Sequence, residues 1–169
     1  MSEASYYLHY DNSGKTFGTG FTPDGTFPAE TIACSQSQAE NFQCWGVAGG
    51  ALVAVTPPTP TLAQQAQAAI SAGFAVTSTS TPALNGTYAC DDAHQARINR
   101  VQGFIAANGK FPNGLTSLPW PDITGAVHEF SSTAEFTAFA SAVADYVMAL
   151  DAVIMGISTT LPPAKATIP

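Results

Sequence analysis

The sequence is poor in charge. Charged residues make up 10% of the 169 residues, whereas globular proteins average about 25%. Only 5 residues are lysine or arginine against 12 aspartate and glutamate, which gives a formal net charge of −7. Because nucleic acids and anionic membranes are bound through clustered basic residues, this balance argues against both as partners. The hydrophobic content of 46% excludes disorder through charge excess, so we expect the chain to fold.

Cysteine is also scarce and widely spaced. Cys34, Cys44 and Cys90 form no CxxC pair, so neither a disulfide framework nor a zinc site is expected. A zinc site made from Cys90, His94 and a second cysteine would have only one loose pair of ligands. The opening residues 1–10 lack the basic cluster and long apolar run of a secretory signal, which favours synthesis in the cytoplasm.

Two further absences bear on partners. No residue from 41 to 90 is charged, which we interpret as burial of this stretch against another chain. The most apolar segment, residues 138–157, is interrupted by Asp145 and Asp151, so we expect a helix of a soluble protein and no membrane insertion.

Prolines divide the chain. Residues 56–61 read TPPTPT, and prolines fix φ and remove amide donors, which predicts a linker. We therefore expect five segments along the chain. They are a β-rich module at 1–55, the proline linker at 56–61, a connector helix with an extended segment at 62–90, a C-terminal module at 91–158 and an extended tail at 159–169.

The first module shows turn signals between short β patterns. The aromatic run 6–10 and the turn 11–14 predict a hairpin that returns through residues 15–19. Gly49-Gly50 predicts a second hairpin with strands at 44–48 and 51–55, and Ser35 can cap a short helix up to Phe42. Gly18-Thr19-Gly20 lacks the lysine and helix of a phosphate-binding loop and is interpreted as a turn.

The second half predicts two helices around a hairpin. A helix opens at Asp91 and Asp92 and stops at Gly109, and strands at 115–118 and 126–130 follow. Ser132 and Glu135 have the spacing of a capping box that begins a long helix. Apolar residues follow it at intervals of three and four: Phe136, Phe139, Val143, Tyr146, Val147, Leu150, Ile154 and Ile157.

That stripe needs a partner. The helix of residues 91–108 is favoured over a coiled coil between copies, because the flanking positions carry alanine and serine rather than alternating charges. Residues 62–72 form a helix with a mostly alanine face, either a connector or a helix completed by a neighbour. The predicted fold class is α+β: a small N-terminal β module plus a C-terminal antiparallel helix pair with a β-hairpin.

No catalytic constellation is recognisable. Asp91 and Asp92 are interpreted as helix caps, because the helix dipole favours their charged form and opposes the raised pKa of a general acid. His9 and His128 lie in predicted strands and are interpreted as rim residues. There is no GxSxG or SxxK motif. We predict no enzyme activity, no cofactor and no bound metal.

Aromatic residues are the candidates for a binding surface. The first 27 residues contain Tyr6, Tyr7, Tyr10, Phe17, Phe21 and Phe27, which would form a sugar-stacking surface, a protein contact or, as the simplest reading, a core. Trp120 lies between two prolines in a predicted exposed loop. We expect its ring to act either as a lid over the helix pair or as an interface anchor. The candidate interface residues are Trp120, Tyr6, Tyr7, Tyr10, Trp45 and Phe74.

Several motifs of the second half resemble a known family. The run Asn108-Gly109-Lys110-Phe111-Pro112, the triplet Trp120-Pro121-Asp122, the strand 125–130 and the final apolar helix resemble a C-terminal domain of unknown function found in tailed-phage proteins. That domain is associated with tail fibre and tail assembly genes. The tyrosine-rich opening, Gly18-Thr19-Gly20 and Gly49-Gly50 look like the head of tail fibre or tail fibre assembly proteins.

The resemblance implies a setting and no active site. It implies a non-enzymatic virion protein of the bacteriophage tail, made in the host cytoplasm, that docks on other tail or fibre proteins and is an oligomer in the particle. One alternative is a tail fibre assembly chaperone that is not retained in the virion. A less favoured alternative is a polysaccharide or cell-wall hydrolase carried on the tail.

The apolar stripe yields a first prediction. Val147→Asp would put an unpaired charge inside it, at a cost of several kcal/mol, so the C-terminal module should not fold. Circular dichroism during heating measures this. An unchanged melting curve would contradict the helix assignment.

Overall fold

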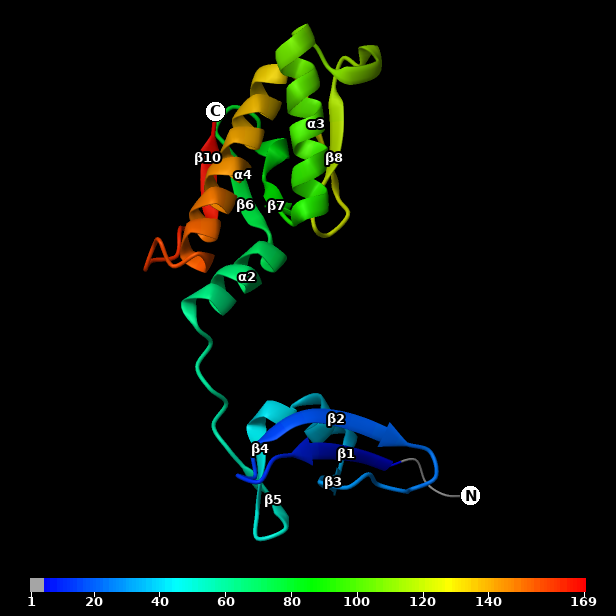
Figure 1. Ribbon diagram of the computed structural model, residues 1–169. Helices are drawn as coiled ribbons and strands as arrows, with labels where there is room; N and C mark the ends of the chain where they lie inside the picture. The colour runs from blue at the N-terminus through cyan, green and yellow to red at the C-terminus, as the bar shows by residue number, and fades with distance from the viewer. Residues whose placement is uncertain (1–4) are drawn as a thin grey trace. The chain divides into compact units, whose positions relative to one another are not determined.

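The computed structural model describes residues 5–169 and divides the chain into two compact units, residues 1–59 and 60–169 (Figure 1). The division falls inside the proline run of residues 56–61, where fixed φ angles and missing amide donors prevent a sheet or helix from continuing. Both strands and helices are present, so the expected mixed α and β class is confirmed.

The N-terminal unit is built on a three-stranded antiparallel sheet with the order β2-β1-β3. Its strands are β1 (Ser5–Tyr10), β2 (Thr16–Thr22) and β3 (Thr31–Cys34). The Asp11 carboxylate accepts hydrogen bonds from the amides of Ser13 and Lys15, which closes the turn predicted after β1. The register shifts by one residue between His9 and Tyr10, so β2 carries a bulge there.

A short helix and a second hairpin complete this unit. They are α1 (Gln36–Glu40), the 3-10 turn η1 (Phe42–Cys44), β4 (Trp45–Ala48) and β5 (Ala51–Ala54). Ser35 and Gln38 form a capping box at α1, and Gly49 and Gly50 both adopt positive φ in the turn between β4 and β5. Both predicted elements are confirmed. α1 packs on β1, and Leu8 and Ala39 are buried there.

The C-terminal unit begins with a helix and a three-stranded sheet. In chain order they are α2 (Leu62–Ala72), β6 (Phe74–Ser78), the 3-10 turn η2 (Pro82–Leu84), β7 (Gly86–Tyr88) and, from the chain end, β10 (Lys165–Ile168). The sheet order is β10-β6-β7, with β10 parallel to β6 and β7 antiparallel to it. α2 has the predicted bounds and ends at Gly73, whose φ is 84°.

Two long helices enclose a second hairpin. The elements are α3 (Asp92–Asn108), the 3-10 turn η3 (Pro112–Gly114), β8 (Leu118–Pro121), β9 (Val127–Phe130) and α4 (Thr133–Ile154). Asp91 caps α3, Gly109 ends it in the left-handed conformation, and Ser132 and Glu135 form the predicted capping box of α4. α3 and α4 run antiparallel, as Figure 1 shows, and the Thr137 hydroxyl donates to Gln102 across them at 3.2 Å.

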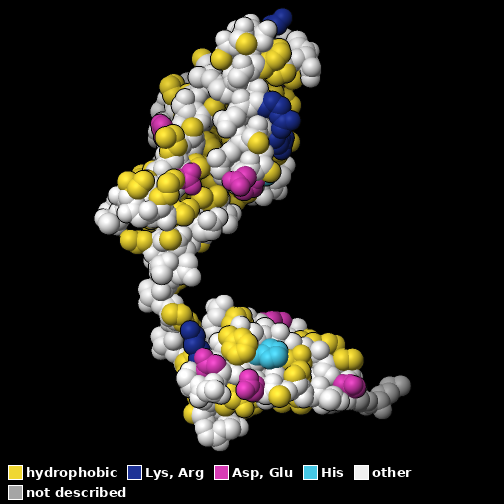
Figure 2. Space-filling model, in the orientation of Figure 1, with side chains coloured by type: hydrophobic (Ala, Val, Ile, Leu, Met, Phe, Trp, Pro, Cys, Tyr) yellow, Lys and Arg dark blue, Asp and Glu magenta, His cyan; other side chains and the backbone are white. Residues whose placement is uncertain are grey.

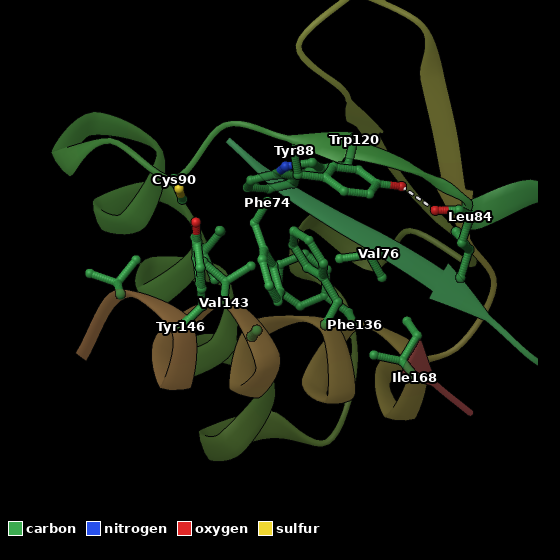
Figure 3. Close-up of a cluster of buried hydrophobic side chains, with 14 of the residues drawn as sticks. Phe74, Val76, Leu84, Tyr88, Cys90, Trp120, Phe136, Val143, Tyr146 and Ile168 are labelled. Carbon is green, nitrogen blue, oxygen red and sulfur yellow. Dashed lines mark hydrogen bonds between the residues drawn. The ribbon is translucent and has the colours of Figure 1, made fainter. Parts of the chain in front are cut away.

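The apolar stripe of α4 forms the core of this unit (Figure 3). Phe74 of β6 stacks on Tyr146 with ring centroids 4.4 Å apart, and the Tyr88 hydroxyl donates to the Leu84 carbonyl at 2.7 Å. The stripe is therefore covered by residues of the same chain, which is the alternative that the sequence favoured over a coiled coil between copies. Its partners include α2 and the sheet as well as α3. Ile154 and Ile157 do not join it, because they are 36% and 77% exposed.

Two expected segment boundaries differ from the structure. Residues 62–90 are no connector, because Ala66, Phe74 and Tyr88 are buried in the core of the C-terminal unit. Residues 159–169 are no extended tail, because β10 pairs with β6 and Ile168 is buried in the same core. The small alanine side chains of α2 are part of the core because α2 packs against α4, whose larger side chains supply most of the buried apolar area.

The uncharged stretch of residues 41–90 was expected to be buried against another chain. Its second half instead supplies α2, β6 and β7, whose apolar residues are buried within the unit. The hairpin of β8 and β9 is also shifted: β8 starts at Leu118 and includes Trp120, which was expected in the loop. Proline at 119 and 121 is tolerated because β8 pairs on one side only, with β9.

By length and composition alone, α4 is apolar enough to cross a membrane. In the folded unit eight of its 22 residues are buried: Phe136, Phe139, Ala140, Val143, Tyr146, Val147, Leu150 and Val153. Asp145 is exposed on the opposite face. These features are those of a helix that forms the core of a folded domain.

The pairing of β10 with β6 yields a second prediction. Ile168→Ala should lower the free energy of unfolding of the C-terminal unit by about 2–4 kcal/mol, because Ile168 is 3% exposed. Lys165→Ala, in the same strand at an exposed position, is the control and should change it by less than about 0.5 kcal/mol. Urea denaturation measures both. Equal stability of the two variants would show that β10 does not belong to the core.

Candidate functional site

A row of four aromatic rings lies on the open side of the β1–β2 hairpin. Strand alternation puts Tyr7 and His9 on one side of β1 and the buried Leu8 on the other. Ring centroids are 5.7 Å apart between Phe17 and His9, 5.3 Å between His9 and Tyr7, and 5.9 Å between Tyr7 and Phe27. We call these four side chains the aromatic face. Figure 2 shows hydrophobic side chains and a histidine together on this unit.

A glycine of β2 allows the Tyr7 ring to lie across the strand. Gly18 pairs with His9 and Gly20 with Tyr7. A Cβ atom on Gly20 would lie 2.3–2.5 Å from three atoms of the Tyr7 side chain, far inside contact distance. A Cβ atom on Gly18 would lie 3.7 Å from His9 Cδ2, which is an ordinary contact. Gly18-Thr19-Gly20 is therefore part of a strand and not the predicted turn. Gly20 makes room for the Tyr7 ring of the neighbouring strand.

The aromatic face remains open to solvent. Phe17 is 60% and Phe27 38% exposed, and Tyr7 and His9 are half-buried. On the other side of the sheet Phe21 is 51% exposed and contacts Tyr6, with ring centroids 5.3 Å apart. Grouped exposed aromatics of this kind are typical of interaction surfaces.

An apolar pocket of about 650 Å³ lies in the same unit. It is formed between the β1–β2 turn, η1, the β4–β5 hairpin and the first residues of the proline run. Its apolar lining residues are Phe42, Trp45, Val47, Val53, Val55 and Pro58. The Thr16 hydroxyl lies 2.8 Å from the Phe42 carbonyl oxygen and 2.7 Å from that of Trp45, and so fixes η1 and β4 against β2. We call this cavity the Trp45 pocket. Lys15 is the charged residue in its lining.

Four of the six predicted interface residues lie in the N-terminal unit and are half-buried: Tyr6, Tyr7, Tyr10 and Trp45. Tyr7 belongs to the aromatic face and Trp45 lines the Trp45 pocket. Sequence reasoning missed the role of His9, which it interpreted as a rim residue. The alternation of Tyr7 and His9 opposite Gly18 and Gly20 is the signal that identifies them as one surface.

The other two predicted interface residues are buried. Trp120 is 3% exposed, with its ring 5.4 Å from Phe136 and the Arg97 guanidinium 5.0 Å from its centroid. It is not in an exposed loop and corresponds to the alternative of a lid over the helices. Phe74 is 2% exposed against Tyr146. Neither offers a surface to a partner, because both rings are covered by side chains of the same unit.

Asp91 and His94, at the start of α3, form hydrogen bonds that cap the helix. The Asp91 carboxylate accepts from the amides of Ala93 and His94 and lies 2.8 Å from His94 Nδ1. These hydrogen bonds, the His94 amide above all, lower the pKa of Asp91. Cys90 is buried, its thiol lies 3.3 Å from the Ile70 carbonyl, and burial raises its pKa. Among residues 5–169 no group of three acidic, histidine or cysteine side chains has the geometry of a metal site.

His128 and Asp122 form a second pair of titratable groups. Asp122 Oδ1 accepts from the Thr124 hydroxyl at 2.7 Å, the Thr124 amide at 2.8 Å and the Ala126 amide at 3.0 Å. His128 Nδ1 lies 2.7 Å from the Ala83 carbonyl, and Nε2 lies 3.4 Å from Asp122 Oδ2. Both partners of the ring are oxygen atoms that accept hydrogen bonds. The pair holds the β8–β9 hairpin against η2.

The sequence was compared with known proteins. A family model described as a domain of unknown function (DUF4376) matches residues 59–153. The match covers the C-terminal unit from α2 through nearly all of α4, and it leaves out the N-terminal unit and β10. The comparison with curated proteins found no match, and neither did the comparison with solved structures.

The environment of Asp122 yields a third prediction. Hydrogen bonds, the Thr124 hydroxyl first, lower its pKa from 3.8 to about 2 although burial opposes them. A lowered pKa in the folded state stabilises the fold above about pH 4, and this contribution is lost as the pH falls toward 2. Asp122→Asn should remove that part of the pH dependence of stability. NMR titration of the carboxylate should give a midpoint near 2 in the native chain and a higher one in Thr124→Ala. Equal midpoints would contradict this assignment.

Proposed function

We propose that this chain, which belongs to the DUF4376 family, is a non-enzymatic structural protein of a bacteriophage tail. The proposal is supported by its exposed aromatic face and by the resemblance of its C-terminal motifs to domains of tailed-phage proteins. In this proposal the chain is part of the virion and docks on neighbouring tail or fibre proteins. The open row of Phe17, His9, Tyr7 and Phe27 is the observation that carries the docking role.

The chemistry of this surface favours a protein partner. Rigid aromatic side chains supply contact area at a low cost in conformational entropy and are frequent anchors of protein interfaces. The Trp45 pocket, on the same unit, adds a concave apolar site of about 650 Å³. Because basic residues are few, the surface has no cluster of positive charge that would favour nucleic acid.

The two-unit organisation supports a bridging role. The proline run separates the units, and such linkers act as semi-rigid spacers. The C-terminal unit has exposed apolar residues of its own after the core part of α4, with Met155 68% and Ile157 77% exposed. Each unit therefore offers a surface to a different neighbour. The setting in the tail rests on the resemblance of the C-terminal motifs to domains of tailed-phage proteins.

The titratable groups support a role without catalysis. Asp91 caps α3, Asp122 holds the β8–β9 turn, and His94 and His128 each contact one of these carboxylates. Hydrogen bonds lower the pKa of both aspartates, which opposes their use as general acids. This is the reason to prefer docking to hydrolysis.

Washed virions test the proposal. We expect mass spectrometry to detect the chain in virions of a phage that encodes it. Phe17→Ser should reduce the amount incorporated, because it removes the most exposed ring of the aromatic face. Leu115→Ser is the matched control: Leu115 is 44% exposed in the C-terminal unit, outside this surface, so incorporation should be unchanged.

Two other results would overturn the proposal. Absence from washed virions together with co-purification on fibre protein would show an assembly chaperone. Degradation of host envelope material by the purified chain, lost in Asp122→Asn, would show a hydrolase.

A further inference from the structure

We infer that the Trp45 pocket binds a small amphiphile, an apolar chain or ring that ends in one carboxylate. The pocket is a separate site from the aromatic face, because none of the four side chains of that face lines it. The inference goes beyond docking on other tail proteins and does not depend on it. It is argued from the volume of the pocket, its lining, its fixed walls and its one charge.

The pocket has the size and the lining of a small-molecule site. Such sites typically measure about 300–1,000 Å³ and are apolar, with a few polar groups that fix the orientation of the ligand. The Trp45 pocket measures about 650 Å³. Phe42, Trp45 and Val47 in its lining are half-buried, and Val53 and Val55 are 39% and 42% exposed. An apolar ligand would remove this surface from water, which favours binding.

Gly46 keeps the hairpin side of the pocket open. It pairs with Val53 across β4 and β5. A Cβ atom at residue 46 would lie 3.1 Å from Val55 Cγ1, 3.4 Å from the Gly14 carbonyl oxygen and 3.9 Å from Val53 Cγ2. A larger side chain at this position would therefore fill the space beside the two valines. Glycine inside a strand often marks such a place of close approach.

Hydrogen bonds between elements hold the walls of the pocket in place. The Val47 amide donates to the Gly14 carbonyl at 2.8 Å and joins β4 to the β1–β2 turn. The Val55 amide donates to the Cys44 carbonyl at 2.8 Å and joins the end of β5 to η1. The Thr16 hydroxyl ties η1 and β4 to β2. The cavity is thus formed before a ligand enters, which lowers the entropic cost of binding.

The charge of the lining selects an anionic end group. Lys15 is the one charged residue of the lining and the only lysine or arginine among residues 1–59. Its side chain is exposed and forms no ion pair among residues 5–169. The Asp11 carboxylate of the same turn instead accepts from the Ser13 amide and hydroxyl and from the Lys15 amide. An ammonium group beside an apolar cavity is complementary to an amphiphilic anion.

A single ammonium group favours a carboxylate over a phosphate. A carboxylate carries one negative charge, which Lys15 balances. A phosphate monoester carries about 1.5 to 2 negative charges at neutral pH and would be balanced only in part. The ligand class is therefore a carboxylate with an apolar body, for example a fatty acid of medium length.

Titration calorimetry of the full chain with decanoate tests the inference. Decanoate should bind at one site, and affinity should fall about threefold to fourfold for each methylene removed toward hexanoate, because each methylene buries apolar surface. Lys15→Gln should weaken decanoate binding by about threefold to tenfold and leave the binding of uncharged decanol unchanged. Lys110→Gln, at an exposed position of the C-terminal unit, is the control and should bind both like the native chain.

A second pair of variants tests the apolar wall. Val53→Asp puts a carboxylate into the lining, where it repels the ligand and reduces the apolar contact, so decanoate binding should be lost. Val127→Asp makes the same change at a strand position of the C-terminal unit that is 62% exposed, and it should bind normally. Circular dichroism of both variants should match that of the native chain, because both valines are exposed.

NMR spectra of the amides locate the site. Decanoate should shift the resonances of Thr16, Gly46 and Val55 and leave those of Tyr7 and His9 in place. Absence of binding to the native chain would overturn the inference. So would decanol that binds as tightly as decanoate, an equal loss in Val53→Asp and Val127→Asp, or shifts confined to the aromatic face.

Discussion

Burial of the apolar stripe of α4 is the interaction on which the C-terminal unit depends. Its phenylalanines, together with Tyr146 and Leu150, contact elements from every other part of the unit, from α2 to the last strand. Each of these elements is short or weakly amphipathic: α2 offers mainly alanine, and β7 has three residues. Helices and strands of this kind gain most of their stability from packing, so they fold because α4 is there to cover them.

The N-terminal unit, in contrast, has a small core and exposes much of its apolar surface. It buries little beyond Leu8 and Ala39 and keeps much of its aromatic area on the surface. Gly20 of β2 makes this arrangement possible, because the Tyr7 ring occupies the space where a side chain at position 20 would stand. A strand shaped in this way presents rings on one side and an uncharged edge.

Several residues that the sequence pattern assigned to an interface are buried inside the C-terminal unit. Trp120, flanked by prolines, has the appearance of an exposed anchor, yet Arg97 and Phe136 enclose its ring. The uncharged segment before Cys90 looked like an interface with another chain and is largely a core within its own unit. Composition predicts that such residues leave water, but it does not specify which surface covers them.

Local sequence is enough to specify the helix caps Ser35, Asp91 and Ser132, the Gly49-Gly50 turn and the break at the prolines. Each depends on hydrogen bonds or φ angles within a few residues, so a short window contains all the information. Long-range packing specifies that β10 pairs with β6, where Thr77 and Thr167 meet although they are 90 residues apart in the sequence. It also specifies that four aromatic side chains form one face. Such contacts depend on which surfaces remain uncovered once the rest of the chain has packed, and no local pattern records that.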